Sequence, residues 1–182
     1  WGPVETGHTD NLLFVARNSE DGALSVCLRG TTTQFFSRVE DIPTSQTAFP
    51  DNNSVGAQVS TEFYKALDLM LTAKDPDKGI TLQEYLTPYA NANQMIYVNG
   101  HSQGAALVPM MMLALRSGWK DAPALPATYQ GFAFAPPTSG NPQFADLVSD
   151  TLDCWFVINP LDIVPLGYDS IKDVIKKDIP GP

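Results

Sequence analysis

The chain has 182 residues, of which 43% are hydrophobic, so it is long enough for one domain with a sizeable core. Its formal net charge of −9 argues against nucleic acid or an anionic membrane surface as a partner, and no apolar run is long enough to span a membrane. Only two histidines and two cysteines are present, without the spacing of metal ligands, so no metal site is expected.

Two short apolar segments near the N-terminus predict an antiparallel hairpin. Residues 11–17 (NLLFVAR) and 24–28 (LSVCL) have the composition of strands, and turn-forming residues fill positions 18–22 between them. The second segment runs into Arg29-Gly30-Thr31, where a glycine followed by hydroxyl residues suits a loop whose backbone N–H groups bind something. An ordinary strand-ending turn is the alternative at this position.

Residues 34–41 (QFFSRVED) predict a short helix or an apolar flap, because three apolar side chains stand among polar ones. These are Phe35, Phe36 and Val39. A loop rich in Ser, Asn, Pro and Thr is expected over residues 44–56. Apolar residues at helical spacing then predict helices over residues 60–73 and 81–92.

Residues 94–115 (QMIYVNGHSQGAALVPMMMLAL) carry the clearest chemical signal in the chain. A short apolar, strand-like run over 95–98 leads into the pattern G-x-S-x-G around Ser102, and a long apolar run of helical composition follows. A strand that reverses sharply into a helix through this pattern is typical of a nucleophile elbow, because glycines without a Cβ fit the crowded turn. The alternative is that Ser102 simply caps the helix.

Other residues with chemically versatile side chains are assigned structural roles. His101 is expected to pack and hydrogen-bond within the elbow, because adjacent side chains on a tight turn diverge, and not to act as a base. Cys27 and Cys154 lie in apolar, strand-like runs and are expected to be buried free thiols. The methionines at 110–112 are expected to fill the core.

The second half of the chain continues the alternation of strands and helices. Strands are predicted over 129–135 and 154–158, with a helix opening at Asn141-Pro142 between them. This order favours an α/β fold with a mostly parallel central sheet, the N-terminal hairpin antiparallel, and helices on both faces. Asp162 follows the last strand and therefore occupies the place of the carboxylate in a Ser, Asp, His triad. A turn-forming role is the alternative for this residue.

Four motifs, taken in order, resemble the class 3 (fungal-type) lipases, a branch of the α/β-hydrolases. They are LRGT ending at Thr31, GHSQGAAL around Ser102, PPTSGNPQF over 136–144, and DIVP beginning at Asp162. The resemblance covers about residues 24–168, and it implies the α/β-hydrolase fold. Two departures are modest, since Leu28 replaces a usual Phe and Ala105 a usual Gly.

The resemblance also implies an activity and a set of site residues. Ser102 would be the nucleophile and Asp162 the triad acid, while the backbone N–H groups of Thr31 and Gln103 would form the oxyanion hole. The segment 32–41 would be a lid whose apolar residues meet lipid: Phe35, Phe36 and Val39. The expected protein is a serine ester hydrolase that cleaves carboxylic esters such as acylglycerols, with a lipid–water interface as one expected place of action, and without a cofactor or metal.

One departure from the family pattern is serious, because the family's histidine base follows the D-x-V-P loop and no histidine follows His101 here. The base is expected on a segment beyond Pro182, so that residues 1–182 would be a single but incomplete domain. An unusual route through His8 is a second option. A chain that opens at Trp1 is expected to be processed or excised, which leaves secretion, slightly favoured, and a soluble cytoplasmic location both open. The rival interpretation is a non-catalytic domain that binds lipid or protein.

Overall fold

The structure is a computed structural model of the chain, and it describes residues 1–6, 11–30, 45–50 and 55–162. The predicted oxyanion residue Thr31 lies outside the described residues, as does the predicted lid over 32–41 with its three apolar side chains. These two predictions are therefore not tested.

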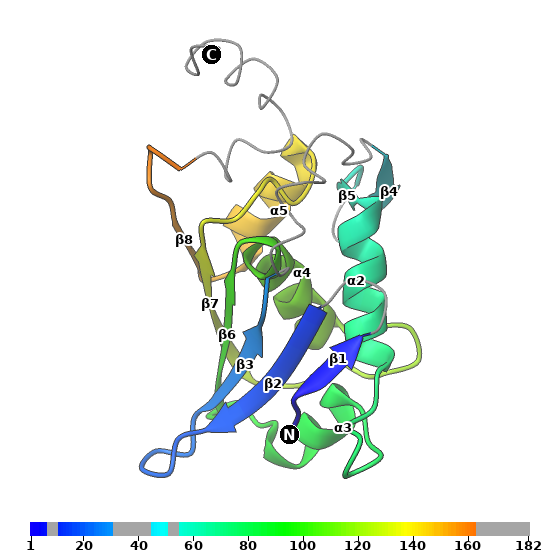
Figure 1. The fold of residues 1–182 in the computed structure, drawn as a ribbon, viewed down its shortest axis with the longest axis vertical. Coiled ribbons are helices and arrows are strands. Elements are labelled where there is room, and N and C mark those ends of the chain that lie inside the picture. The colour runs from blue at the N-terminus through cyan, green and yellow to red at the C-terminus, as the bar shows by residue number, and fades with distance from the viewer. Residues whose placement is uncertain (7–10, 31–44, 51–54, 163–182) are drawn as a thin grey trace, which may run out of the picture.

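A six-stranded sheet organises the molecule, with strand order β1-β2-β3-β6-β7-β8 (Figure 1). The strands are β1 (Val4–Thr6), β2 (Asn11–Arg17), β3 (Leu24–Leu28), β6 (Met95–His101), β7 (Thr128–Phe134) and β8 (Cys154–Val157). β1, β2 and β3 pair antiparallel, whereas β3, β6, β7 and β8 all run in the same direction. The mostly parallel sheet with an antiparallel N-terminal hairpin is therefore confirmed, and the carboxyl ends of four strands meet at one edge.

The remaining elements connect these strands. They are α2 (Thr61–Thr72), α3 (Leu82–Leu86), the 3-10 helix η2 (Thr87–Tyr89), α4 (Gln103–Ser117), α5 (Pro142–Thr151) and a small sheet of β4 (Gln46–Ala48) with β5 (Gln58–Ser60). The helix predicted over 81–92 is wrong in length, because Pro88 lacks the N–H that would continue α3 and the chain tightens into η2 instead. The small sheet was also missed, since β4 lies within the segment 44–56 predicted as loop and β5 follows that segment.

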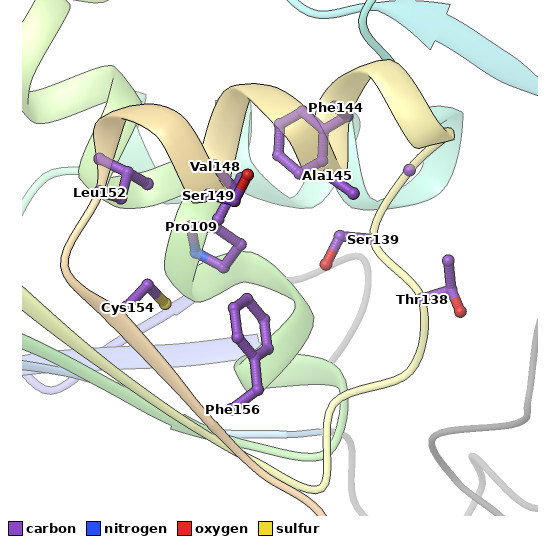
Figure 2. A pocket seen from close by; sticks show the side chains of 11 residues that line it. Pro109, Thr138, Ser139, Phe144, Ala145, Val148, Ser149, Leu152, Cys154 and Phe156 are labelled. Carbon is purple, nitrogen blue, oxygen red and sulfur yellow. The ribbon is translucent and has the colours of Figure 1, made fainter.

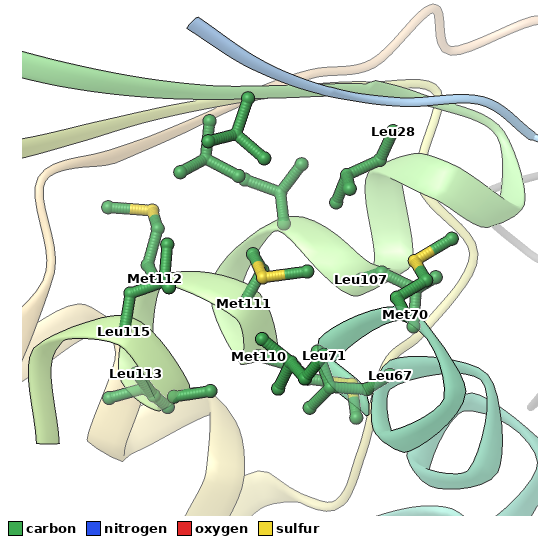
Figure 3. Close-up of a cluster of buried hydrophobic side chains, with 14 of the residues drawn as sticks. Leu28, Leu67, Met70, Leu71, Leu107, Met110, Met111, Met112, Leu113 and Leu115 are labelled. Carbon is green, nitrogen blue, oxygen red and sulfur yellow. The ribbon is translucent and has the colours of Figure 1, made fainter. Parts of the chain in front are cut away.

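The core lies between one face of the sheet and the helices α2, α4 and α5 (Figure 1). Alternate residues of each strand face the helices; on β3 these are Leu24, Val26 and Leu28. Every residue of α4 from Gln103 to Leu115 is buried, and Figure 3 shows Met110 beside Leu67 and Leu71 of α2. The prediction that the methionines fill the core is confirmed. Helix cover on the opposite face of the sheet stays a prediction.

Asp75 anchors the N-terminus of the chain to the loop after α2. Its carboxylate is buried and accepts hydrogen bonds from the backbone N–H groups of Gly2 at 2.7 Å, Asp77 at 2.9 Å and Lys78 at 2.8 Å. The indole of Trp1 donates to the carbonyl of Ile80 at 3.0 Å nearby. The bond from Gly2 is the largest cause that holds the pKa of Asp75 below its usual value of 3.8.

We expect this anchor to make the stability of the fold fall in acid. Because the folded pKa of Asp75 is lowered, its contribution is fully present above the unfolded pKa and is lost as the pH falls through the folded pKa. The melting temperature of Asp75→Asn should lie below wild type at neutral pH, and the difference should shrink in acid. Asp77→Asn, which changes an exposed carboxylate next to it, is the control and should show little difference at any pH. If the melting temperature of Asp75→Asn lies below that of wild type by the same amount at every pH, the electrostatic account is wrong.

Candidate active site

Ser102 sits in a strained turn between β6 and α4. Its backbone has φ 55° and ψ −127°, a conformation that a residue with a side chain rarely adopts. Three hydrogen bonds hold it there: its N–H donates to the carbonyl of Phe134 at 2.9 Å, and its carbonyl accepts from Ala105 at 2.9 Å and Ala106 at 3.2 Å. The hydroxyl makes no capping hydrogen bond to the helix. The capping alternative therefore does not explain why a serine stands here.

The glycines two residues before and two residues after Ser102 are required because there is no room for a side chain at either position. A Cβ added to Gly100 would lie 2.4 Å from the carbonyl oxygen of Gly104, and one added to Gly104 would lie 2.4 Å from the carbonyl oxygen of Leu28. Real Cβ atoms essentially never come this close to a backbone oxygen. The pattern G-x-S-x-G therefore closes the turn on itself and seats it against β3.

The end of β3 touches the elbow directly. A Cβ on Gly30 would lie 3.2 Å from the Cβ of Ser102 and 3.5 Å from the backbone nitrogen of Gln103. Gln103 is the first residue of α4, so its N–H has no acceptor within the helix and lies at the positive end of the helix dipole. This arrangement suits an N–H group that binds an oxyanion beside Ser102. Thr31, the predicted second donor, follows Gly30 in sequence.

Asp162 stands in a tight turn after β8. The side-chain oxygen of Asn159 accepts from the N–H of Leu161 at 3.0 Å, and the carbonyl of Asn159 accepts from the N–H of Asp162 at 2.9 Å. Asp162 itself is half-buried. Since β8 runs parallel to β7 and β6, this turn emerges at the same edge of the sheet as Ser102. The topology thus brings both predicted triad positions to one edge.

His101 does not take the packing role expected of it, because its side chain is exposed. It is the last residue of β6, and Gly100 before it is buried toward α4. Alternation along a strand therefore directs the His101 side chain to the opposite face of the sheet. Its exposure agrees with the expectation that it is not the base of a Ser102 nucleophile.

The family assignment follows from comparison with known proteins. The family model described as lipase (class 3) matches residues 25–167. The chain belongs to the class 3 lipase family. Comparison with curated protein sequences gives no significant match.

Solved lipases share the fold of this class 3 lipase chain. M37 lipase superposes with a TM-score of 0.82 at 24% identity, over 97% of this chain and 56% of that one. Lipase II from Rhizopus niveus gives 0.70 at 24% identity, over 92% and 59%. The lipase from Rhizopus microsporus var. chinensis gives 0.68 at 25% identity, over 89% and 53%. The chain thus spans little more than half the length of these lipases.

The segment 136–144, which contains Asn141, connects three elements: α4, α5 and β5. These contacts were not predicted from the sequence. The Asn141 side-chain oxygen accepts from Gln58 at 2.9 Å and from Phe144 at 3.0 Å, and its amide donates to Gly56 at 2.9 Å. Two residues earlier, the hydroxyl of Ser139 donates to the carbonyl of Ala106 in α4 at 2.8 Å. The segment therefore fixes α5 and β5 against α4, the helix that follows Ser102. The motif PPTSGNPQF over 136–144 is its signal in the sequence.

An apolar cavity of about 340 Å³ opens between α4, α5 and β8 (Figure 2). Its walls include Pro109 of α4, Phe144 and Val148 of α5, and Cys154 and Phe156 of β8. Burial is the main cause that raises the pKa of Cys154 to about 12, so its thiol stays protonated at neutral pH. Cys154 is a free thiol, half-buried rather than fully buried as expected.

In the described part of the chain, no group of three or more His, Cys, Asp or Glu side chains is arranged to hold a metal ion. No helix of the described residues is both long and apolar enough to cross a membrane.

Proposed function

We propose that this class 3 lipase chain carries the nucleophile of a serine ester hydrolase, which cleaves carboxylic esters through an acyl-enzyme on Ser102. The single observation that supports the proposal most is the strained backbone of Ser102 between a buried strand and a buried helix. Strain of this kind is kept where the surrounding structure imposes it, and such positions cluster at active sites. Acylglycerols are the proposed substrates, by analogy with the family and with the lipases that share the fold.

In the proposed reaction, the hydroxyl oxygen of Ser102 attacks the ester carbonyl while a histidine accepts its proton. Asp162 holds that histidine in the correct tautomer. The N–H groups of Gln103 and Thr31 bind the oxyanion, and loss of one such donor typically lowers kcat by about 10²–10³. The protonated histidine then gives its proton to the leaving alcohol. The same histidine next accepts a proton from water, which attacks the acyl-enzyme and releases the acid and the free Ser102 hydroxyl. The segment 32–41 is proposed as the lid that covers this site.

The base is proposed to come from outside the described residues. Among those residues His101 is the single histidine, and its side chain is exposed on the far face of the sheet from α4. A histidine on a further C-terminal segment fits the order Ser, Asp, His. Residues 1–182 would then be most of one α/β-hydrolase domain that needs this segment for full activity.

Imidazole in solution tests the proposal with the chain as it is. Imidazole can replace a missing general base, so it should accelerate hydrolysis of p-nitrophenyl butyrate by the wild-type chain beyond its effect in Ser102→Ala. It should likewise accelerate labelling by a p-nitrophenyl phosphonate ester, and peptide mass mapping should place the label on Ser102. Equal rates in both proteins with no label on Ser102 would favour the non-catalytic binding domain instead.

A further inference from the structure

Gln103 carries a side chain that the elbow itself does not require. The pattern G-x-S-x-G leaves this position open, and the proposed oxyanion donor is its backbone N–H, which almost any residue would supply. The rest of the buried run of α4, from Gly104 to Leu115, contains only apolar residues. A glutamine at the start of this run therefore needs an explanation of its own.

The side chain of Gln103 is buried without a hydrogen bond in the described part of the chain. Only 8% of the residue is exposed, yet none of the described residues pairs with its carboxamide. Buried polar groups are normally paired, because an unpaired one has lost its hydrogen bonds to water. Gln83, by contrast, is 5% exposed and its side-chain N–H donates to the carbonyl of Pro123. An unpaired carboxamide beside a nucleophile therefore indicates a group that pairs with it when a ligand binds.

The position of Gln103 brings this carboxamide to the candidate active site. Gln103 follows Ser102 directly and begins α4, and because Cα–Cβ bonds tilt toward the N-terminus of a helix, its side chain leans toward the elbow. Its backbone nitrogen and the Cβ of Ser102 both lie within 3.5 Å of where a Cβ on Gly30 would stand. The unpaired hydroxyl of Ser60 is fully sealed, whereas the carboxamide of Gln103 is not among the sealed polar atoms. A ligand can therefore reach it.

We propose that Gln103 is a specificity-determining residue, whose carboxamide binds a free hydroxyl of the substrate next to the scissile ester. This inference rests on the proposed ester hydrolysis at Ser102, and it narrows the substrate class to partial acylglycerols, which keep a hydroxyl on the glycerol. A carboxamide both donates and accepts hydrogen bonds, and so does a hydroxyl, so the two groups pair fully. An ester oxygen only accepts, so a fully esterified glycerol leaves the carboxamide less well paired.

The first test compares two butyrate esters that differ in their hydroxyls, monobutyrin and propyl butyrate, in a polypeptide that contains the base. The wild type should prefer monobutyrin in kcat/KM. Gln103→Met keeps the length of the side chain but removes its hydrogen-bonding groups, so this preference should fall roughly 10-fold. A wild type without the preference, or a Met variant that keeps it, overturns the inference while hydrolysis at Ser102 stands. If the wild type hydrolyses neither ester, the proposed function fails and the inference fails with it.

Gln83→Met is the matched control, because it makes the same substitution at a buried glutamine that has a partner. Loss of the hydrogen bond to Pro123 should lower the melting temperature by about 2–4 °C and leave the preference for monobutyrin unchanged. Gln103→Met has no such bond to lose and should melt at or above the temperature of wild type. If Gln103→Met instead melts lower and loses rate equally on both esters, Gln103 has a structural role and the inference is wrong.

Gln103→Asn is a second variant in case the Met variant does not fold. It keeps the carboxamide but shortens the side chain by one methylene, which withdraws the group from the substrate hydroxyl. The preference for monobutyrin should therefore fall in this variant too, measured with the same two esters. An Asn variant with the full wild-type preference would show that the carboxamide does not contact the hydroxyl, and the inference would be withdrawn.

Discussion

Replacing Ser102 with alanine should lower kcat for p-nitrophenyl butyrate by roughly 10⁴–10⁶ in a polypeptide that contains the base. The change removes the only atom proposed to attack the ester, while the oxyanion donors and the binding surface stay in place. The residual rate should therefore remain above that of water. KM should change little, because the lost interaction belongs to the transition state. Stopped-flow and steady-state measurements on the two proteins give both quantities.

Ser139→Ala is the matched control for this experiment. It removes a hydroxyl that donates to Ala106 on the same helix at 2.8 Å, and so tests whether loss of any nearby hydroxyl disturbs the elbow. It should lose some stability but keep kcat within a small factor. If Ser102→Ala retains wild-type kcat, the nucleophile lies elsewhere and the proposed mechanism fails.

Replacing Asp162 with asparagine should lower kcat by about 10³–10⁴ with the melting temperature almost unchanged. An amide in place of the carboxylate would still fit the turn, but it would favour the wrong tautomer of the histidine and would not stabilise the imidazolium. Because Asp162 bonds through its backbone N–H to Asn159, the turn itself should survive the substitution. The assay is again hydrolysis of p-nitrophenyl butyrate by the polypeptide with the base.

Asp153→Asn serves as the control for Asp162, since it makes the same chemical change at the other end of β8. Asp153 is exposed and accepts from Gln130 at 2.8 Å and from the indole of Trp155 at 3.0 Å. Its replacement should leave kcat near wild type. Equal losses in both variants would show that the effect of Asp162 is structural or global, and the triad role would be withdrawn.

Sequence reasoning reached the parts of the fold that local chemistry determines. The hairpin of β2 and β3 follows from two apolar runs around a turn, and the elbow follows from glycines that no other residue can replace at contacts of 2.4 Å. The site could be assembled at one edge because parallel strands share a direction.

The missed features depend on contacts between distant residues. β4 and β5 are three residues each, and β5 is held by Asn141, far away in sequence, so no local pattern announces them. Pro88, two residues after the end of α3, is visible in the sequence, but the apolar stripe through Tyr89 favoured a longer helix. The exposure of His101 depends on which face of the sheet the helices cover, and a single strand does not reveal this.

The backbone conformation of Ser102 lowers the stability of the fold while it serves the proposed chemistry. At φ 55° a serine is more strained than a glycine, and relief of such strain is worth on the order of 1–3 kcal/mol. Ser102→Gly should therefore melt at a higher temperature than wild type while it loses the hydroxyl altogether, which differential scanning calorimetry can measure. A lower melting temperature would mean that the three backbone hydrogen bonds make this conformation comfortable for serine. If Ser102→Gly melts at the higher temperature, thermostability and reactivity are opposing demands at this residue. Screens that select only for stable variants would then be expected to discard the nucleophile.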